Sequence, residues 1–77
     1  MKPTVYVETS VISYASARIS RNPMTAFRQR LTKKWWEEIL PQVASYLSPV
    51  VLDEISRGNK EESAKRLERA SVCNMLE

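Results

Sequence analysis

The chain contains no histidine, one cysteine and one glycine among its 77 residues. Without histidine there is no imidazole to act as a general base, so any hydrolysis must use carboxylates, hydroxyls, lysines or a metal ion. Cys73 is the only cysteine, which excludes an intramolecular disulfide. A lone thiol in a chain without histidine also argues for a reducing compartment and against a zinc site.

Long apolar runs are absent as well. No run approaches the roughly 20 residues of a membrane span, and the N-terminus lacks the apolar segment of a signal peptide. We therefore expect a cytoplasmic protein without membrane contact. A chain of 77 residues forms one domain at most. Such short chains remove only about 60% of their unfolded surface from water, so we expect stability to depend on a partner chain or on self-association.

Acidic residues are missing between Thr9 and Trp36, while half of the 12 basic residues fall there. One interpretation is a phosphate-binding patch, with Arg28, Arg30, Lys33 and Lys34 as its candidate contacts. The alternative is an ordinary solvated helix face, and charge alone favours it.

Helix and strand signals follow one another in the first half of the chain. Residues 4–7 predict a strand buried on both faces, and Thr9 or Ser10 is expected to cap the helix that follows. Asn22 and Pro23 predict the start of a second helix, which Pro41 ends. Five apolar residues spaced by three and four predict its inward face: Met24, Phe27, Leu31, Trp35 and Ile39. Trp36 lies off this stripe and either packs on the first helix, which we favour, or forms part of a contact surface.

In the second half, residues 43–47 predict another strand, and Ser48-Pro49 predicts a short helix that ends at Gly58. Asn59 predicts the start of a last helix, and residues 72–76 predict the beginning of a third strand. The order β-α-α-β-α-α, with this third strand, predicts an α/β fold with a thin, parallel, Rossmann-like sheet.

Two acids occupy corresponding places in this order. Glu8 directly follows the first strand, and helical spacing directs Glu54 toward the sheet while Asp53 faces water. Because parallel strands end at one edge, we expect Glu8 and Glu54 to converge and to bind Mg²⁺ or Mn²⁺. The alternative is that Glu8 is an ordinary acid stabilised by the dipole of the following helix.

The segments Val-Tyr-Val-Glu-Thr-Ser-Val-Ile-Ser-Tyr at 5–14 and Tyr-Leu-Ser-Pro-Val-Val-Leu-Asp-Glu-Ile-Ser-Arg-Gly at 46–58 resemble the first half of a PIN domain of the VapC toxin type. The resemblance implies a parallel-sheet nuclease fold, metal-dependent cleavage of RNA, and a toxin role that an antitoxin protein holds in check. It places Glu8 at the family's first metal-site acid, which is more often aspartate, and Glu54 at the second. Ser10 matches the small hydroxyl residue that supports the first acid.

PIN domains are longer than this chain, and their other site acids come from later segments. Residues 1–77 are therefore expected to form a partial PIN-like domain, its N-terminal half. Two hypotheses remain open. In the first, Glu8 and Glu54 are the catalytic and metal-binding residues of an endoribonuclease, and four basic residues contact its RNA: Arg28, Arg30, Lys33 and Lys34. In the second, the chain is not catalytic, and it binds an antitoxin or forms a homodimer through apolar helices.

Overall fold

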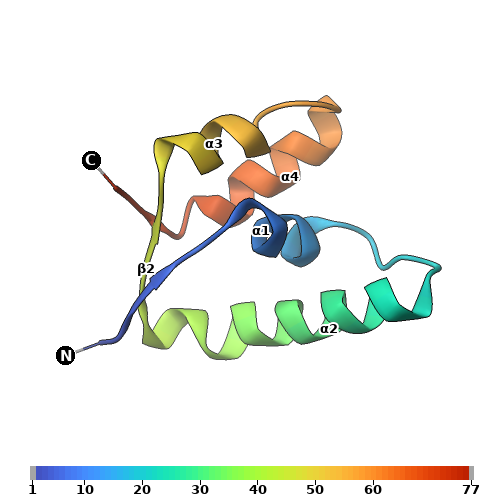
Figure 1. The fold of residues 1–77 in the computed structure, drawn as a ribbon, viewed down its shortest axis with the longest axis horizontal. Helices are drawn as coiled ribbons and strands as arrows, with labels where there is room; N and C mark the ends of the chain where they lie inside the picture. The colour runs from blue at the N-terminus through green and yellow to red at the C-terminus, as the bar shows by residue number, and fades with distance from the viewer. Residues whose placement is uncertain (1, 77) are drawn as a thin grey trace.

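A computed structural model describes residues 2–76 and shows an α/β fold (Figure 1). The elements follow the predicted order, including the third strand. They are β1 (Thr4–Tyr6), α1 (Thr9–Ser16), α2 (Pro23–Glu38), a short 3₁₀ turn η1 (Leu40–Gln42), β2 (Ala44–Leu47), α3 (Pro49–Ile55), α4 (Lys60–Ala70) and β3 (Asn74–Met75).

The three strands form one parallel sheet in the order β1-β2-β3. Tyr6 is level with Tyr46 on β2, and Tyr46 is level with Asn74 on β3. Each neighbouring pair is joined by a helical crossover, as parallel strands require. The predicted parallel sheet is therefore confirmed, and β2 is its central strand.

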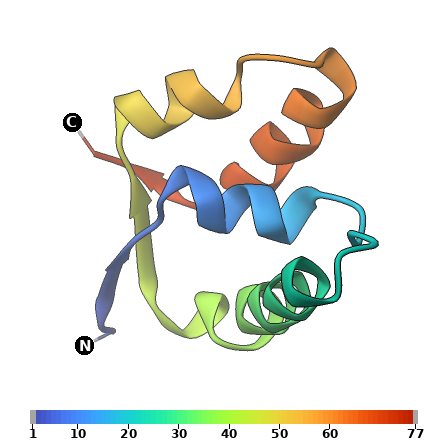
Figure 2. The ribbon, with the colours of Figure 1, turned by 45° about the vertical axis from the view of Figure 1, so that its right-hand side comes forward.

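Within the described residues, all four helices lie on one side of the sheet (Figures 1 and 2). On this side Ser45 and Leu47 of β2 are buried, as is Val7 directly after β1. On the other side Tyr6 remains 65% exposed, with its ring centroid 6.3 Å from that of Tyr46. The prediction that the first strand is buried on both faces is wrong, because no described helix covers the Tyr6 face.

Helix α1 lies at the centre of the helical layer and contacts α2, α3 and α4. Its residues Ile12 and Ala15 are completely buried. The expected cap by Thr9 or Ser10 is wrong, because the helix already begins at Thr9 and Glu8 occupies the N-cap position. The Glu8 side chain makes no capping bond, so α1 is held mainly by its packing.

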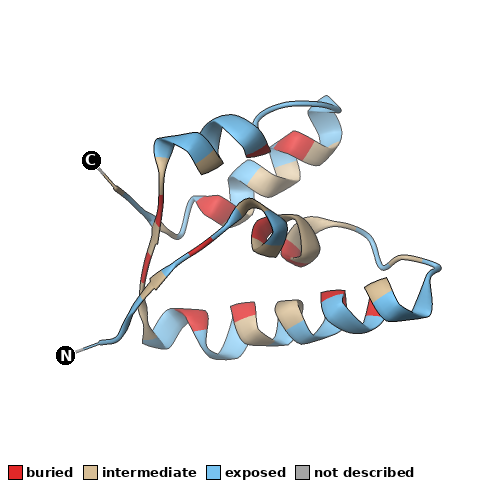
Figure 3. Ribbon diagram, in the orientation of Figure 1, coloured by how far each residue is buried: buried red, intermediate tan, exposed pale blue. Residues whose placement is uncertain are grey.

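Helix α2 begins as predicted, since the Asn22 side chain accepts hydrogen bonds from the backbone N–H groups of Met24 and Thr25. Its buried face differs from the prediction. Trp36 is only 6% exposed and packs in the core, whereas Phe27 is 57% exposed. Figure 3 shows the alternation of buried and exposed segments along this helix. Four residues of the predicted inward stripe are exposed: Met24, Phe27, Leu31 and Ile39.

Polar anchors accompany this orientation of α2. Gln29 is 3% exposed, and its side chain donates to the Arg18 carbonyl at 2.8 Å and accepts from the Ser20 N–H at 2.7 Å. Lys33 donates to the Ala15 carbonyl at 2.7 Å. These bonds satisfy a carbonyl in the last turn of α1 and a carbonyl and an amide in the segment that follows it, and they require the Gln29 side of α2 to face inward.

Candidate metal centre at the carboxyl edge of the sheet

Glu8 and Glu54 are placed by the two elements that leave neighbouring strands. Glu8 follows β1 in an extended conformation and its carbonyl starts α1, while Glu54 lies in α3, which directly follows β2. Because β1 and β2 are paired and parallel, both residues lie beyond the carboxyl ends of the strands.

One hydrogen bond joins these two elements. The Thr9 hydroxyl donates to Oε1 of Glu54 at 2.9 Å. The structure thus brings the Glu54 carboxylate to the residue directly after Glu8, across 45 positions of sequence.

Both carboxylates are exposed at the rim of the fold. The expectation that Glu54 faces the sheet is therefore wrong in part, because Ile55 takes the buried position on α3 and is 0% exposed. Asp53 faces water as predicted, and it pairs with Arg57 at 2.6 Å. A carboxylate at the rim keeps its hydration, so it can exchange a water for a cation at little cost.

Ser10 does not occupy the supporting position that the resemblance gave it. Its side chain is exposed, and no hydrogen bond of its hydroxyl occurs among residues 2–76. The hydroxyl that bonds to an acid at this edge is that of Thr9, and its partner is Glu54 and not the first acid. From the sequence, Thr9 was expected only to cap a helix, although its place directly after the first acid is a signal for this role.

The oxygen donors present here suit Mg²⁺ or Mn²⁺. Magnesium is typically bound by one or two carboxylates, and water and substrate phosphates complete its shell. Glu8 and Glu54 can supply those carboxylates. Among residues 2–76 there is no group of three or more histidine, cysteine or acidic side chains that could hold a metal ion. Glu8 and Glu54 could supply at most two carboxylates, so a cation held by them would take its other ligands from water or phosphate.

The basic residues of α2 are separated from Glu54 by helix α1. In Figure 1, α2 and α3 lie on opposite sides of α1. Arg28, Arg30 and Lys34 are exposed and remain available to a phosphate backbone.

Lys33 is the exception among the four predicted RNA contacts, because it is half-buried and bonds to α1. Burial lowers the pKa of Lys33, the nearby Arg69 lowers it further, and Glu37 partly opposes both. Its ammonium group is thus already engaged in joining α2 to α1.

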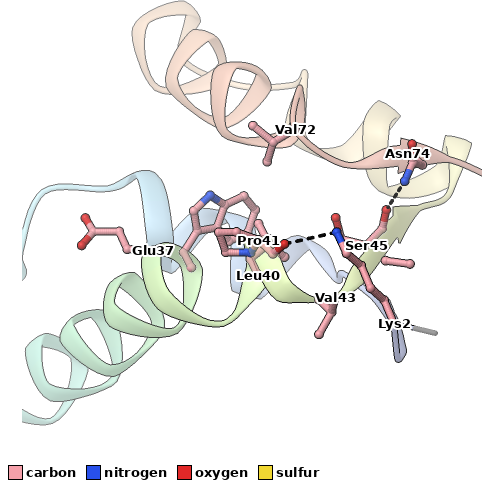
Figure 4. A pocket seen from close by; sticks show the side chains of 10 residues that line it. Lys2, Glu37, Leu40, Pro41, Val43, Ser45, Val72 and Asn74 are labelled. Atoms are coloured by element: carbon pink, nitrogen blue, oxygen red, sulfur yellow. Dashed lines mark hydrogen bonds between the residues drawn. The ribbon is translucent and has the colours of Figure 1, made fainter.

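Hollows elsewhere on the described part of the molecule lie away from Glu8 and Glu54. One of about 620 Å³ is bordered by Trp36, Leu40 and Val72, with Lys2 and Asn74 at its polar side (Figure 4). A second of about 420 Å³ lies beside β1 and is mainly apolar, lined by Val5, Tyr6, Val7, Val11, Leu31, Thr32 and Trp35. Neither lining includes Glu8 or Glu54.

Comparisons of the chain with models of protein families, with curated proteins and with solved structures found no match. A function is therefore inferred from the geometry and chemistry of these residues. Within the described part of the chain, no helix has both the length and the apolar character needed to cross a bilayer.

Proposed function

We propose that this chain carries part of a PIN-like, metal-dependent endoribonuclease site, in which Glu8 and Glu54 bind Mg²⁺ or Mn²⁺. The observation that carries the proposal is the hydrogen bond from Thr9 to Glu54, which gathers residues from α1 and α3 at one edge of the sheet. This edge is where open parallel sheets place their ligands.

A cation bound at this edge would polarise a phosphate oxygen and generate a nucleophilic water. The chain's own residues have simpler roles. Glu8 and Glu54 supply negative charge, and Thr9 fixes the orientation of Glu54. Arg28, Arg30 and Lys34 attract RNA through their long-range field. The site takes its remaining oxygen ligands from water, from RNA phosphates, or from acids of another polypeptide.

The cation site can be tested without catalysis. We expect Mn²⁺ to broaden the backbone amide signals of residues 8–10 and 53–55 in nitrogen-15 NMR spectra of the chain. Glu8→Gln and Glu54→Gln should each abolish the broadening, since each removes a carboxylate. Asp53→Asn is the matched control, because Asp53 lies on the same helix but pairs with Arg57. Broadening that survives Glu8→Gln, or that is equally lost in Asp53→Asn, would contradict the site.

Cleavage is measured separately, with a labelled RNA and Mg²⁺ or Mn²⁺. Cleavage by the parent chain that disappears in Glu8→Gln would support the enzyme. If the chain binds Mn²⁺ but does not cleave RNA, the proposal holds only for the metal site and not for catalysis by this chain.

A second candidate function is association without catalysis, in which an antitoxin protein covers the exposed stripe of α2. The observation that favours it is the exposure of Met24, Phe27 and Leu31 on one side of this helix. It predicts that association with the antitoxin is lost in Phe27→Ala and Leu31→Ala but persists in Glu8→Gln. Loss of association in Glu8→Gln alone would contradict it.

A further inference from the structure

Strand β1 leaves one edge of the sheet open. It pairs with β2 on one side only, and Figure 2 shows it at the outside of the sheet. The Pro3 carbonyl accepts from the Ala44 N–H, and the Val7 N–H donates to the Tyr46 carbonyl, both at 2.8 Å. Because backbone groups alternate in direction along a strand, the N–H and C=O groups of Thr4 and Tyr6 point away from β2. No strand among residues 2–76 pairs with them on that side.

This edge is short, with three residues in β1, but proline does not block pairing along it. Edge strands are often protected by proline or by charged residues. Pro3 does not serve here, because its missing N–H group falls on the side that faces β2. The charged residues at the two ends of the edge have opposite signs: Lys2 and Glu8 are both exposed.

We propose that the free edge of β1 pairs with the same edge of a second copy of this chain, in antiparallel orientation about a twofold axis at Val5. In this register Thr4 lies opposite the partner's Tyr6, and these two residues exchange both of their outward hydrogen bonds. Val5 then lies opposite the partner's Val5. These two residues exchange no backbone hydrogen bonds, because the backbone groups of each point toward β2 of its own copy. The result is a closed dimer with one continuous six-stranded sheet.

The charges at the ends of β1 select this register. With Thr4 opposite the partner's Tyr6, Lys2 lies opposite the partner's Glu8, and the twofold axis repeats the pair. A shift of two residues in either direction leaves both charges without a partner, so the register is specified by electrostatics as well as by hydrogen bonds. Lys2 must leave the Pro41 carbonyl, which its ammonium group contacts at 3.5 Å (Figure 4). That distance is at the limit of a hydrogen bond, so little is lost.

Apolar surface beside β1 supports the same arrangement. A twofold axis between antiparallel strands is perpendicular to the sheet, so both helical layers lie on one face. The apolar hollow next to β1, with Val5, Leu31 and Trp35 in its lining, then lies beside its copy. Val5 and the exposed side chain of Leu31 lose contact with water as the two copies meet.

This dimer does not depend on the proposed cation site, although Glu8 belongs to both. Its test therefore measures assembly in metal-free buffer with a chelator present. Sedimentation of the parent chain should show a monomer–dimer equilibrium between low micromolar and near-millimolar concentration. Lys2→Glu and Glu8→Lys each place like charges opposite one another twice, so each variant alone should dimerise at least tenfold more weakly.

An equimolar mixture of the two variants gives the decisive measurement. In the mixed dimer, the new glutamate at position 2 of one chain lies opposite the new lysine at position 8 of the other. The second pair, between the unchanged Glu8 of the first chain and the unchanged Lys2 of the second, is also attractive. The mixture should therefore recover the dimerisation of the parent chain. Lys60→Glu and Glu61→Lys are matched controls on α4, where both side chains are exposed, and each should dimerise like the parent.

Several results would overturn the proposal. The parent chain could stay monomeric at every concentration, or it could form open-ended assemblies. The mixture of the two variants could also associate no better than either variant alone. Circular dichroism reports whether each variant folds. If a variant is unfolded alone, a mixture that stays unfolded overturns the proposal as well.

Discussion

Adjacent residues with similar side chains have different roles in this protein. Thr9 and Ser10 both carry hydroxyl groups and both follow Glu8. Only Thr9 reaches Glu54, because successive residues of α1 point about 100° apart and Thr9 is the one that faces α3. Ser10 faces water. Which of the two hydroxyls reaches Glu54 depends on where α3 lies, and the residue types at positions 9 and 10 do not specify that.

This difference can be measured as stability. Thr9→Val keeps the shape of the side chain but removes the donor to Glu54, so we expect it to lower the free energy of unfolding by about 0.5–1.5 kcal/mol. Ser10→Ala should change it by less than about 0.5 kcal/mol, since Ser10 is exposed. Urea unfolding followed by circular dichroism compares the two. An equal loss in both variants would show that the bond to Glu54 contributes nothing.

At the scale of an element, α2 shows how polar anchors can oppose an apolar stripe. Its most regular apolar residues, including Phe27 and Leu31, are exposed, while Gln29 and Trp36 are buried. Turning the stripe inward would place Gln29 in water. It would also leave the Arg18 carbonyl and Ser20 N–H without the partners that Gln29 now provides. The stripe remains at the surface, where it can serve an interface.

Two substitutions on this helix test its orientation. Trp36→Ala removes a core indole, and we expect it to lower the free energy of unfolding by about 3–5 kcal/mol. Phe27→Ala should lower it by less than about 1 kcal/mol, because Phe27 is 57% exposed. Both replace an aromatic residue of the same helix by alanine, so helix propensity changes in the same direction. A larger effect of Phe27→Ala would mean that the stripe faces the core after all.

The whole molecule is a thin sheet with helices on one side only, among the residues described. Parallel sheets are usually covered on both faces, and here the face that carries Tyr6 and Tyr46 is open. Both edge strands, β1 and β3, also have only one neighbouring strand among residues 2–76. A small chain with such surfaces has a limited core, and association is a direct way to bury more apolar area.

Association should appear in thermal unfolding. For a dimer that unfolds to two chains, a tenfold rise in concentration should raise the unfolding midpoint by roughly 4 °C, given typical unfolding entropies for two chains of this length. Lys2→Glu should reduce this concentration dependence over the same range, because the variant dimerises more weakly. Scanning calorimetry at two concentrations measures it. A midpoint for the parent chain that does not move with concentration would indicate a monomeric folding unit.

The sequence by itself determined the order and the beginnings of most elements. Asn22, Ser48 and Asn59 cap helices as predicted, since capping is a bond between residues two or three positions apart. It also predicted that Glu8 and Glu54 lie at one edge, because paired parallel strands end together.

Only the tertiary structure decided which face of α2 is buried, that no helix within residues 2–76 covers one face of the sheet, and that Thr9 is the residue that reaches Glu54. It also decided that Lys33 joins two helices and that α1 separates the basic residues of α2 from α3. Each of these depends on contacts between elements far apart in the chain. An apolar stripe or a row of charges looks the same in sequence whether it faces a core, a partner or water, and only the packed arrangement distinguishes them.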